Sequence, residues 1–182
     1  LYGTYLGGTG VEHSGDLAAN GSGVAVVAGT TLSSSFPVKA ALQPALAGGA
    51  DAFVARIDTT GSGSDSLVSS TFHGGSDADY ALAVAVDSLG HATVAGHTLS
   101  LDLPTPGGFQ TTNGSAGKPS PRDGFVATLS ADGSALLYGS YLGGAETDLA
   151  YALKGAGAGR LLVAGRTFSD DFPTRDPWQS VR

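Results

Sequence analysis

Acidic side chains are the residues of this chain that are best suited to chemistry. The 182 residues include 16 Asp and Glu, and many of them recur at equivalent places in the sequence. One group is expected to be available to a ligand: Asp77, Asp79, Asp102, Glu146, Asp148, Asp170 and Asp171. A second group offers candidate metal ligands: Glu12, Asp16, Asp51 and Asp123. Carboxylates from neighbouring loops suit Ca²⁺, which takes about six to eight oxygen ligands.

A structural role competes with calcium binding at these carboxylates. Asp in turns commonly accepts hydrogen bonds from backbone N–H groups. Asp51 and Asp123 hold the same repeat position, two residues before Phe53 and Phe125, which favours a role in building the repeat over two identical active sites. The chain has no EF-hand loop. We therefore expect structural carboxylates, keep calcium as the alternative, and find no sign of another cofactor.

Other catalytic patterns are absent from the sequence. There is no Gly-x-Ser-x-Gly elbow, and the Gly-rich stretches lack the Lys-Ser/Thr and helix of a phosphate loop. Cysteine is absent, so disulfides and thiolate metal sites are excluded. No metal-ligand spacing connects the four histidines, which are His13, His73, His91 and His97. An enzyme is therefore the less favoured interpretation.

Composition and charge narrow the classes of partner. The net charge of −7 opposes binding to a phosphate backbone, so nucleic acid is not expected as a partner. Apolar stretches are short, and membrane insertion is not expected either. The 29 glycines are interleaved with Ala, Val, Leu and Ser, which is typical of many short strands joined by tight turns.

The chain must position its acidic residues through an internal repeat. The Gly-Gly pair that ends at Gly8 returns at Gly75 and Gly144, at spacings of 67 and 69 residues. The Val-Ala-Gly-x-Thr motif, whose Gly is residue 29, 96 and 165, keeps the same two spacings. Two motifs that share one period indicate about 2.7 copies of one structural unit.

Each unit offers four strand candidates, and the second copy shows them best. They are Ala81–Val86, His91–Gly96, Phe125–Leu129 and Leu136–Leu142. Tight turns join the first pair and the last pair, while a long loop joins the middle two. No helical period is convincing, although Val38–Leu46 can form one short turn of helix.

Four antiparallel strands repeated in tandem predict an all-β fold of β-propeller blades, arranged as an incomplete ring. Residues 1–182 are expected to form a single propeller segment. Residues 1–8 form the outer strand of a preceding blade, 9–75 and 76–144 are complete blades, and 145–182 are a partial blade. Since a ring needs about four or more blades, other blades of one polypeptide or of neighbouring chains are expected partners.

At these residues the chain resembles the bacterial SBBP ("seven-bladed beta-propeller") repeat family. The resemblance is carried by Tyr-Leu-Gly-Gly at 141–144, Val-Ala-Gly-x-Thr at 163–167, Phe-Pro-Thr at 172–174 and Asp-Ala-Phe-Val-Ala at 51–55. The first two strands of each unit also resemble those of NHL-type propellers. The resemblance implies an extracellular or cell-surface location in bacteria and no uniform activity.

In such a blade, the long loops and the connections between blades share one face, which we call the loop face. Most acidic residues are expected there, and long loops on a rigid scaffold commonly carry binding. Phe36 and Phe172 are expected to anchor the long loops in apolar hollows. Trp178, the counterpart of Phe109, is expected to pack within its repeat.

Three functions follow from these features. The leading one is a non-enzymatic adhesion or scaffold module that binds a protein or glycan at the cell surface through its loop face. The second is a hydrolase or lyase that acts on polysaccharide or phosphoesters with a cation at the propeller mouth. The third is a structural subunit of a fibre or sheath, joined through open strand edges.

Overall fold

A computed structural model describes residues 1–19, 21–157 and 159–180. Within these residues the chain forms ten β-strands, the short 3₁₀ turn η1 (Gly63–Ser66) and no α-helix, which confirms the all-β prediction. The strands are β1 (Glu12–Ala19), β2 (Val24–Thr31), β3 (Asp51–Asp58), β4 (Leu67–His73), β5 (Asp79–Val86), β6 (Ala92–Thr98), β7 (Asp123–Leu129), β8 (Leu136–Leu142), β9 (Asp148–Gly155) and β10 (Leu161–Thr167).

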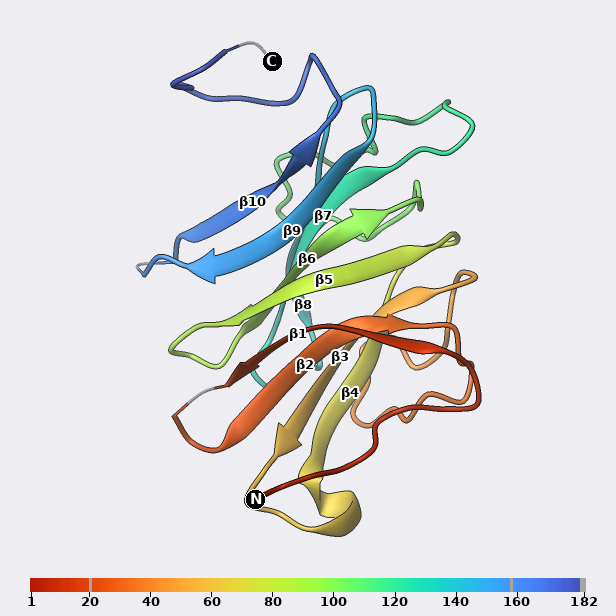
Figure 1. The fold of residues 1–182 in the computed structure, drawn as a ribbon, viewed down its shortest axis with the longest axis vertical. Coiled ribbons are helices and arrows are strands. Elements are labelled where there is room, and N and C mark those ends of the chain that lie inside the picture. Colours follow the sequence, from red (N-terminus) through yellow and green to blue (C-terminus); the bar gives the residue numbers. More distant parts are fainter. Residues whose placement is uncertain (20, 158, 181–182) are drawn as a thin grey trace.

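The strands form three antiparallel sheets that follow one another along the long axis of the molecule (Figure 1). The first sheet has the order β1-β2-β3-β4 and the second has the order β5-β6-β7-β8. The third contains β9 and β10 alone. The predicted four-stranded antiparallel unit is therefore confirmed, and each sheet follows the order of the chain.

β5 and β7 each begin two residues closer to the loop face than the sequence pattern indicated. Asp79 and Asp123 are the first residues of β5 and β7, and Glu12 and Asp148 begin β1 and β9 in the same way. Asp79, Asp123 and Asp148 tolerate a buried strand position because their carboxylates accept hydrogen bonds there. An apolar run alone does not reveal this extension.

The segment Val38–Leu46 does not form the short helix considered from the sequence. Its backbone instead runs beside the outer strand β4. Lys39 and Ser70 exchange two backbone hydrogen bonds of 3.0 and 2.8 Å, and Phe72 N donates to Gln43 O at 3.1 Å. The edge of β4 therefore supplies the hydrogen-bond partners that a helix would otherwise have provided within the segment.

Neighbouring sheets pack face to face, and their first strands lie side by side. β5 contacts β1, β2 and β3, and β9 contacts β5, β6 and β7 in the same manner. A Cβ on Gly15 of β1 would lie only 2.3 Å from the carbonyl oxygen of Ala81 in β5, so this contact between first strands requires glycine. Asp16 Oδ2 also accepts a 3.1 Å hydrogen bond from Val84 N of β5.

Small and medium apolar residues fill the space between the sheets. The largest cluster joins the first two sheets and includes Val26, Val54, Val94 and Phe125. Ala95, Val126 and Ala150 form a smaller cluster between the second and third sheets. The second sheet is thus covered on both faces, which explains why its strands contain continuous apolar runs.

The two ends of the chain differ from the complete units. Residues 1–8 form no strand in the structure, so their expected membership of a preceding blade stays a prediction. The first two strands expected for the last unit are present as β9 and β10. Residues 158, 181 and 182 of that expected unit lie outside the described part of the chain.

Candidate functional site

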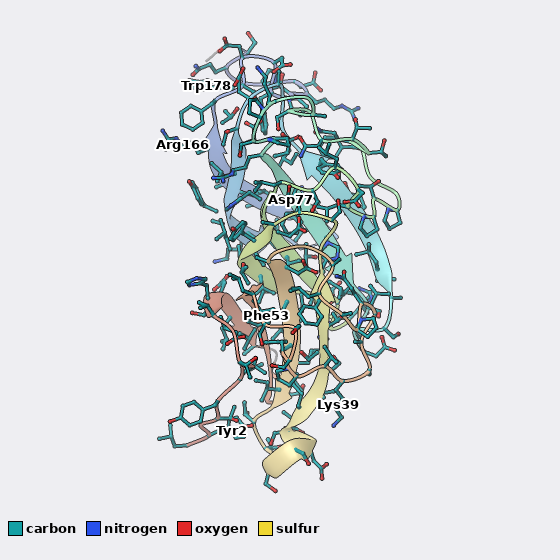
Figure 2. The ribbon with its side chains drawn as sticks, turned by 90° about the vertical axis from the view of Figure 1, so that its right-hand side faces the viewer. Tyr2, Lys39, Phe53, Asp77, Arg166 and Trp178 are labelled. Carbon is teal, nitrogen blue, oxygen red and sulfur yellow. The ribbon has the colours of Figure 1, made fainter. Side chains whose placement is uncertain are left out.

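The candidate site is the loop face, where the connections between sheets meet the long loops; it is turned toward the viewer in Figure 2. The antiparallel order of the first sheet places the end of β2 beside the start of β3, at the same edge at which β4 ends. Hydrogen bonds join these segments directly. Asp79 N donates to Ala50 O at 2.7 Å, and Leu99 N donates to Ala78 O at 2.9 Å. The two kinds of loop therefore form one continuous surface.

The first carboxylate of the second sheet holds three segments together. Asp79 accepts hydrogen bonds from Gly75 N at 2.8 Å, from Ser100 Oγ at 2.9 Å and from Thr98 Oγ1. The Asp79 side chain is fully buried. It thus ties the Gly-Gly segment after β4 to the start of the long loop after β6.

The third sheet repeats this arrangement with equivalent residues. Asp148 accepts hydrogen bonds from Gly144 N at 2.8 Å and from Ser169 Oγ at 2.7 Å. Glu12 takes the same role in the first sheet, where it accepts bonds from Gly8 N at 3.2 Å and Thr31 Oγ1 at 3.0 Å. Recurrence in every sheet indicates that these carboxylates build the fold.

The carboxylates at the start of the third strands close the long loops. Asp51 accepts bonds from Gln43 Nε2 at 2.7 Å, from Ala47 N at 2.9 Å and from Gly48 N at 3.0 Å. Asp123 repeats this pattern with Gln110 Nε2 at 3.2 Å and Gly114 N at 2.6 Å. The structure therefore supports the structural role that repetition favoured for Asp51 and Asp123.

Close approach of these carboxylates explains the repeated Gly-Gly pair. A Cβ on Gly74 would lie 2.6 Å from Asp51 Cγ, and one on Gly75 would lie 2.3 Å from Asp102 Oδ1. The equivalent Cβ on Gly143 would lie 2.6 Å from Asp123 Cγ. Any side chain at Gly74 or Gly143 would displace a buried carboxylate, and one at Gly75 would displace Asp102 and Ser100.

Burial shapes the protonation of the loop face. Burial raises the pKa of Asp79 to about 6, against the hydrogen bonds that lower it, with a smaller contribution from nearby Asp51. Burial likewise raises the pKa values of Asp51 and Asp123. The buried ring of His73 has its pKa lowered to about 4 by desolvation. These groups lie inside the protein, and their burial in the folded structure is what shifts their pKa values.

The remaining predicted residues divide between surface turns and the strand interior. Asp102 and Asp171 are exposed and accept bonds of 2.8 Å from Ser76 N and Ala145 N. Asp77 and Asp170 are exposed as well, while Glu146 forms a 2.7 Å ion pair with Lys118. The described structure therefore leaves some carboxyl groups at the surface.

The expected placement of Asp16 in a connection between blades is wrong. Asp16 lies inside β1, at a bulge in its pairing with β2, and bonds to Val84 N of the neighbouring sheet. The sequence reading placed the start of this strand too late, because the polar residues from Glu12 to Asp16 interrupt the apolar pattern.

Within the described ranges, no group of three or more His, Asp or Glu side chains is arranged to hold a metal ion. One oxygen of Asp123 and one of Asp148 are buried without a hydrogen-bond partner. Ser115 approaches Asp123, but its hydroxyl donates to Asn113 Oδ1 at 2.8 Å. Calcium binding remains a prediction from the sequence.

Sequence reasoning missed the uncharged residues that complete these junctions. Thr98 and Ser100 recur as Thr167 and Ser169, and Gln43 recurs as Gln110. The available signal was their constant distance from the Gly of Val-Ala-Gly in the same unit. Because these side chains carry no charge, the sequence pattern did not indicate that their hydroxyl and amide groups donate hydrogen bonds to the carboxylates.

One apolar side chain in each unit points away from the junction. Leu42, Phe109 and Trp178 precede the equivalent glutamines and are 38%, 63% and 99% exposed. The packing role expected for Trp178 is therefore wrong; Figure 2 shows it projecting from the C-terminal loop. The neighbouring glutamine provides the reason, because Gln110 turns inward to Asp123 and Gly143, which leaves Phe109 outward.

Phe36 occupies the buried position that was expected for an anchor of the long loop. Phe36 is buried, and its ring centroid lies 4.5 Å from that of Phe53 and 5.9 Å from that of Phe72. Phe172 is only partly buried and lines a pocket beside β10. The difference arises because the third sheet has no strand equivalent to β3 beside β10 in this structure.

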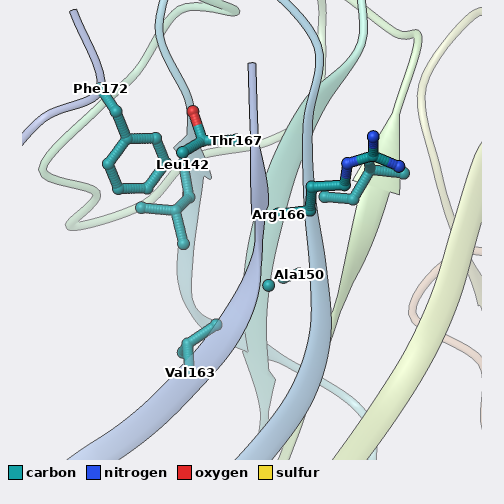
Figure 3. Close-up of a pocket in the computed structure, with 8 residues that line it drawn as sticks. Leu142, Ala150, Val163, Arg166, Thr167 and Phe172 are labelled. Carbon is teal, nitrogen blue, oxygen red and sulfur yellow. The ribbon is translucent and has the colours of Figure 1, made fainter. Parts of the chain in front are cut away.

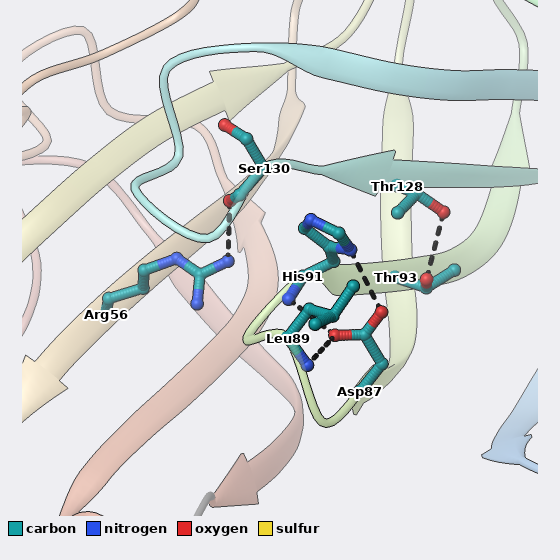
Figure 4. Close-up of polar contacts among 7 residues, drawn as sticks. All are labelled: Arg56, Asp87, Leu89, His91, Thr93, Thr128 and Ser130. Atoms are coloured by element: carbon teal, nitrogen blue, oxygen red, sulfur yellow. Dashed lines mark hydrogen bonds and ion pairs between the residues drawn. The ribbon is translucent and has the colours of Figure 1, made fainter. Parts of the chain in front are cut away.

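The face opposite the loop face carries short turns that also connect the sheets (Figure 4). Arg56 of β3 is buried and donates from Nη2 to Ser130 O at 2.9 Å, which ties the first sheet to the β7–β8 turn. His91 and Asp87 form a 2.9 Å ion pair within the β5–β6 turn. The Arg56 contact gives this face a role in holding adjacent sheets together, while the His91–Asp87 contact stabilises its own turn.

Comparison with known proteins assigns no family. No protein-family model matches the chain, and no curated protein matches it either. The likeness to SBBP repeats therefore rests on the residues alone. Among the described residues, no helix has the length and apolar character needed to cross a membrane.

Proposed function

We propose that this chain is a segment of a β-propeller that acts as a non-enzymatic binding module at the bacterial cell surface. The propeller is supported by the face-to-face packing of successive four-stranded units, with β1, β5 and β9 on the same side (Figures 1 and 2). A structure of the native polypeptide tests the arrangement. First strands that surround an axis agree with it, and sheets stacked in an open line contradict it.

One observation carries the binding function, namely the outward row of Leu42, Phe109 and Trp178. The first two units turn a glutamine inward to a buried carboxylate, and all three units present one large apolar side chain to solvent on the loop face. Aromatic side chains contribute strongly at binding surfaces, because they offer large apolar area with little loss of side-chain entropy. Equivalent sites on successive units favour multivalent binding.

The acidic residues favour this function over catalysis. Asp79, whose pKa is raised to about 6, is fully buried, and both of its oxygens accept hydrogen bonds. A general acid must reach the substrate within hydrogen-bond distance. The same carboxylate arrangement also recurs in each sheet, which is typical of a building element.

A titration followed through the fluorescence of Trp178 tests the proposal, since this is the single Trp of the chain. The probes are soluble neutral polysaccharides and purified bacterial surface proteins. A saturable change in emission is expected with a glycan or protein partner, and Phe109→Ser is expected to weaken binding about tenfold.

The matched control is Leu89→Ser, because Leu89 is also a large exposed apolar residue but lies on the β5–β6 turn of the opposite face. This variant is expected to bind like the parent. Equal weakening by both substitutions, or no saturable binding to any probe, would contradict binding through the loop face.

A further inference from the structure

The outer edge of β10 differs from the equivalent edge in both complete sheets. β2 lies between β1 and β3, and β6 lies between β5 and β7. β10 pairs with β9 alone, and its Leu161, Leu162 and Val163 are exposed. An exposed apolar strand edge is a template for pairing with another strand, and natural proteins usually cover or interrupt it.

A pocket lies beside this edge, between the second and third sheets (Figure 3). Leu142 of the second sheet, Val163 and Gly165 of β10, and Phe172 of the following loop form its walls. Figure 3 shows Phe172 and Leu142 on one side of this space and Val163 below them. The walls are mostly apolar, so the pocket suits an aromatic or aliphatic side chain.

The first sheet shows which side chain occupies the equivalent place. Phe53 of β3 stacks on Phe36, and its ring covers Gly29 so closely that a Cβ there would lie 2.8 Å from the ring. Gly165 and Phe172 hold the repeat positions of Gly29 and Phe36, and both line the pocket. The pocket therefore corresponds to the space that Phe53 fills in a complete sheet.

The register of the complete sheets defines how a strand would fit. Thr31 pairs with Asp51 and Gly29 with Phe53 in the first sheet. Thr98 pairs with Asp123 and Gly96 with Phe125 in the second. The same register on β10 sets an Asp opposite Thr167 and a Phe opposite Gly165, in antiparallel orientation.

We infer that β10 binds an extended segment with the pattern Asp-x-Phe-Val-Ala, whose Phe enters the pocket. The occupant is a strand of this repeat that is equivalent to β3 and β7, the third strands of the complete sheets. A second copy of this chain does not supply it, because β3 and β7 are each paired on both sides within their own sheets. This inference rests on the repeat geometry and is independent of binding at Phe109.

A synthetic peptide with the sequence of residues 123–129 tests the inference on the full chain. Fluorescence anisotropy of the labelled peptide is expected to show saturable binding, and hydrogen exchange is expected to slow at the amides of β10. A peptide that carries Phe125→Ala is expected to bind at least tenfold more weakly. Absence of binding, equal affinity of the two peptides, or protection elsewhere would overturn the inference.

Protein variants separate this edge from the loop face. Val163→Glu places a charge in the pocket and is expected to abolish peptide binding. Leu162→Glu is the matched control, since its side chain points to the other face of β10, and it is expected to retain binding. Phe109→Ser is expected to leave peptide binding unchanged, so failure of this inference is distinguishable from failure of the proposed function.

Discussion

At the scale of single residues, the buried carboxylates act as hydrogen-bond centres. Each one accepts hydrogen bonds from backbone N–H groups and from a hydroxyl or amide side chain, and this explains how acidic residues are accommodated at the starts of buried strands. Charge at such sites is costly unless it is paired or hydrogen-bonded. The hydrogen bonds of Asp79 offset part of that cost, and the raised pKa reflects the rest.

Replacement of Asp79 by Ala is expected to destabilise the protein by about 3 kcal/mol, because buried donors on Gly75, Thr98 and Ser100 lose their acceptor. Chemical denaturation measures this free energy. Asp102→Ala is the control, since Asp102 is exposed and loses one hydrogen bond, and its cost is expected to stay below about 1 kcal/mol. Comparable costs for both variants would contradict the structural role of Asp79.

His73 is expected to make the protein sensitive to acid. Its folded-state pKa of about 4 lies below its ordinary value of 6.5, so the unfolded chain binds the proton first as the pH falls. Stability is therefore lost between pH 6.5 and 4, by about 3 kcal/mol from this group. His73→Leu, which introduces the residue found at the equivalent position 142, is expected to remove that loss.

The measurement for His73 compares unfolding free energies of the parent and the variant across this pH range. The difference in unfolding free energy between the two proteins isolates the contribution of His73, because Asp79 is present in both. Asp79 has a raised pKa and acts in the opposite sense: it stabilises the folded protein at low pH, and this effect is lost as the pH rises to about 6. A difference that does not change with pH would contradict the prediction.

At the scale of elements, backbone segments from adjacent sheets approach so closely that only glycine fits between them. A Cβ on Gly48, in the long loop of the first sheet, would lie 1.8 Å from the carbonyl oxygen of Asp77. Nothing lies within 4 Å of the equivalent point on neighbouring Gly49. Of these two adjacent glycines, only Gly48 is required by the close contact between the loops.

Gly48→Ala is expected to destabilise the protein by about 2 kcal/mol or more, since the loop must move away from Asp77. Gly49→Ala provides a matched control one residue away, and its effect is expected within about 0.5 kcal/mol. Thermal unfolding of the two variants distinguishes these results. Equal melting temperatures would mean that the loop adapts without cost.

Arg56 has the corresponding role on the opposite face. Arg56→Met retains most of the buried stem but removes the charged donor that joins β3 to Ser130 O, and a loss of about 1–2 kcal/mol is expected. Lys39→Met removes an exposed cation and is expected to change stability little. Urea titrations of both variants test this difference, and the expectation fails if Arg56→Met is as stable as the parent.

At the scale of the whole molecule, protection from solvent decreases from the centre to the ends. The second sheet is covered on both faces, whereas β9 and β10 form a two-stranded sheet whose outer strand is exposed. A strand pair with few covering contacts opens more readily than a covered sheet.

Hydrogen exchange is expected to follow this gradient. Amides of β6 and β7 should exchange at least tenfold more slowly than those of β10, because β10 opens locally without unfolding the rest. Mass spectrometry of peptides from each strand measures the rates. Uniform exchange across the three sheets would indicate a single cooperative unit and contradict the prediction.

The sequence by itself determined the repeat and the antiparallel four-strand unit. Two motifs with a common period located the units, and apolar runs between tight turns located most strands. It also indicated that Asp51 and Asp123 build the repeat. These features are local or periodic, so they leave a signal in one chain.

Only the tertiary structure decided which side chains of the loop face point inward. The inward turn of Gln110, the exposure of Trp178 and the position of Asp16 within β1 depend on contacts between segments far apart in the chain. The pocket beside β10 also depends on such contacts. It is open because the third sheet has no third strand within the described residues, and in a complete sheet that strand covers the equivalent space. The repeat shows which residues recur, but the direction in which each side chain points depends on contacts made only after the sheets have packed.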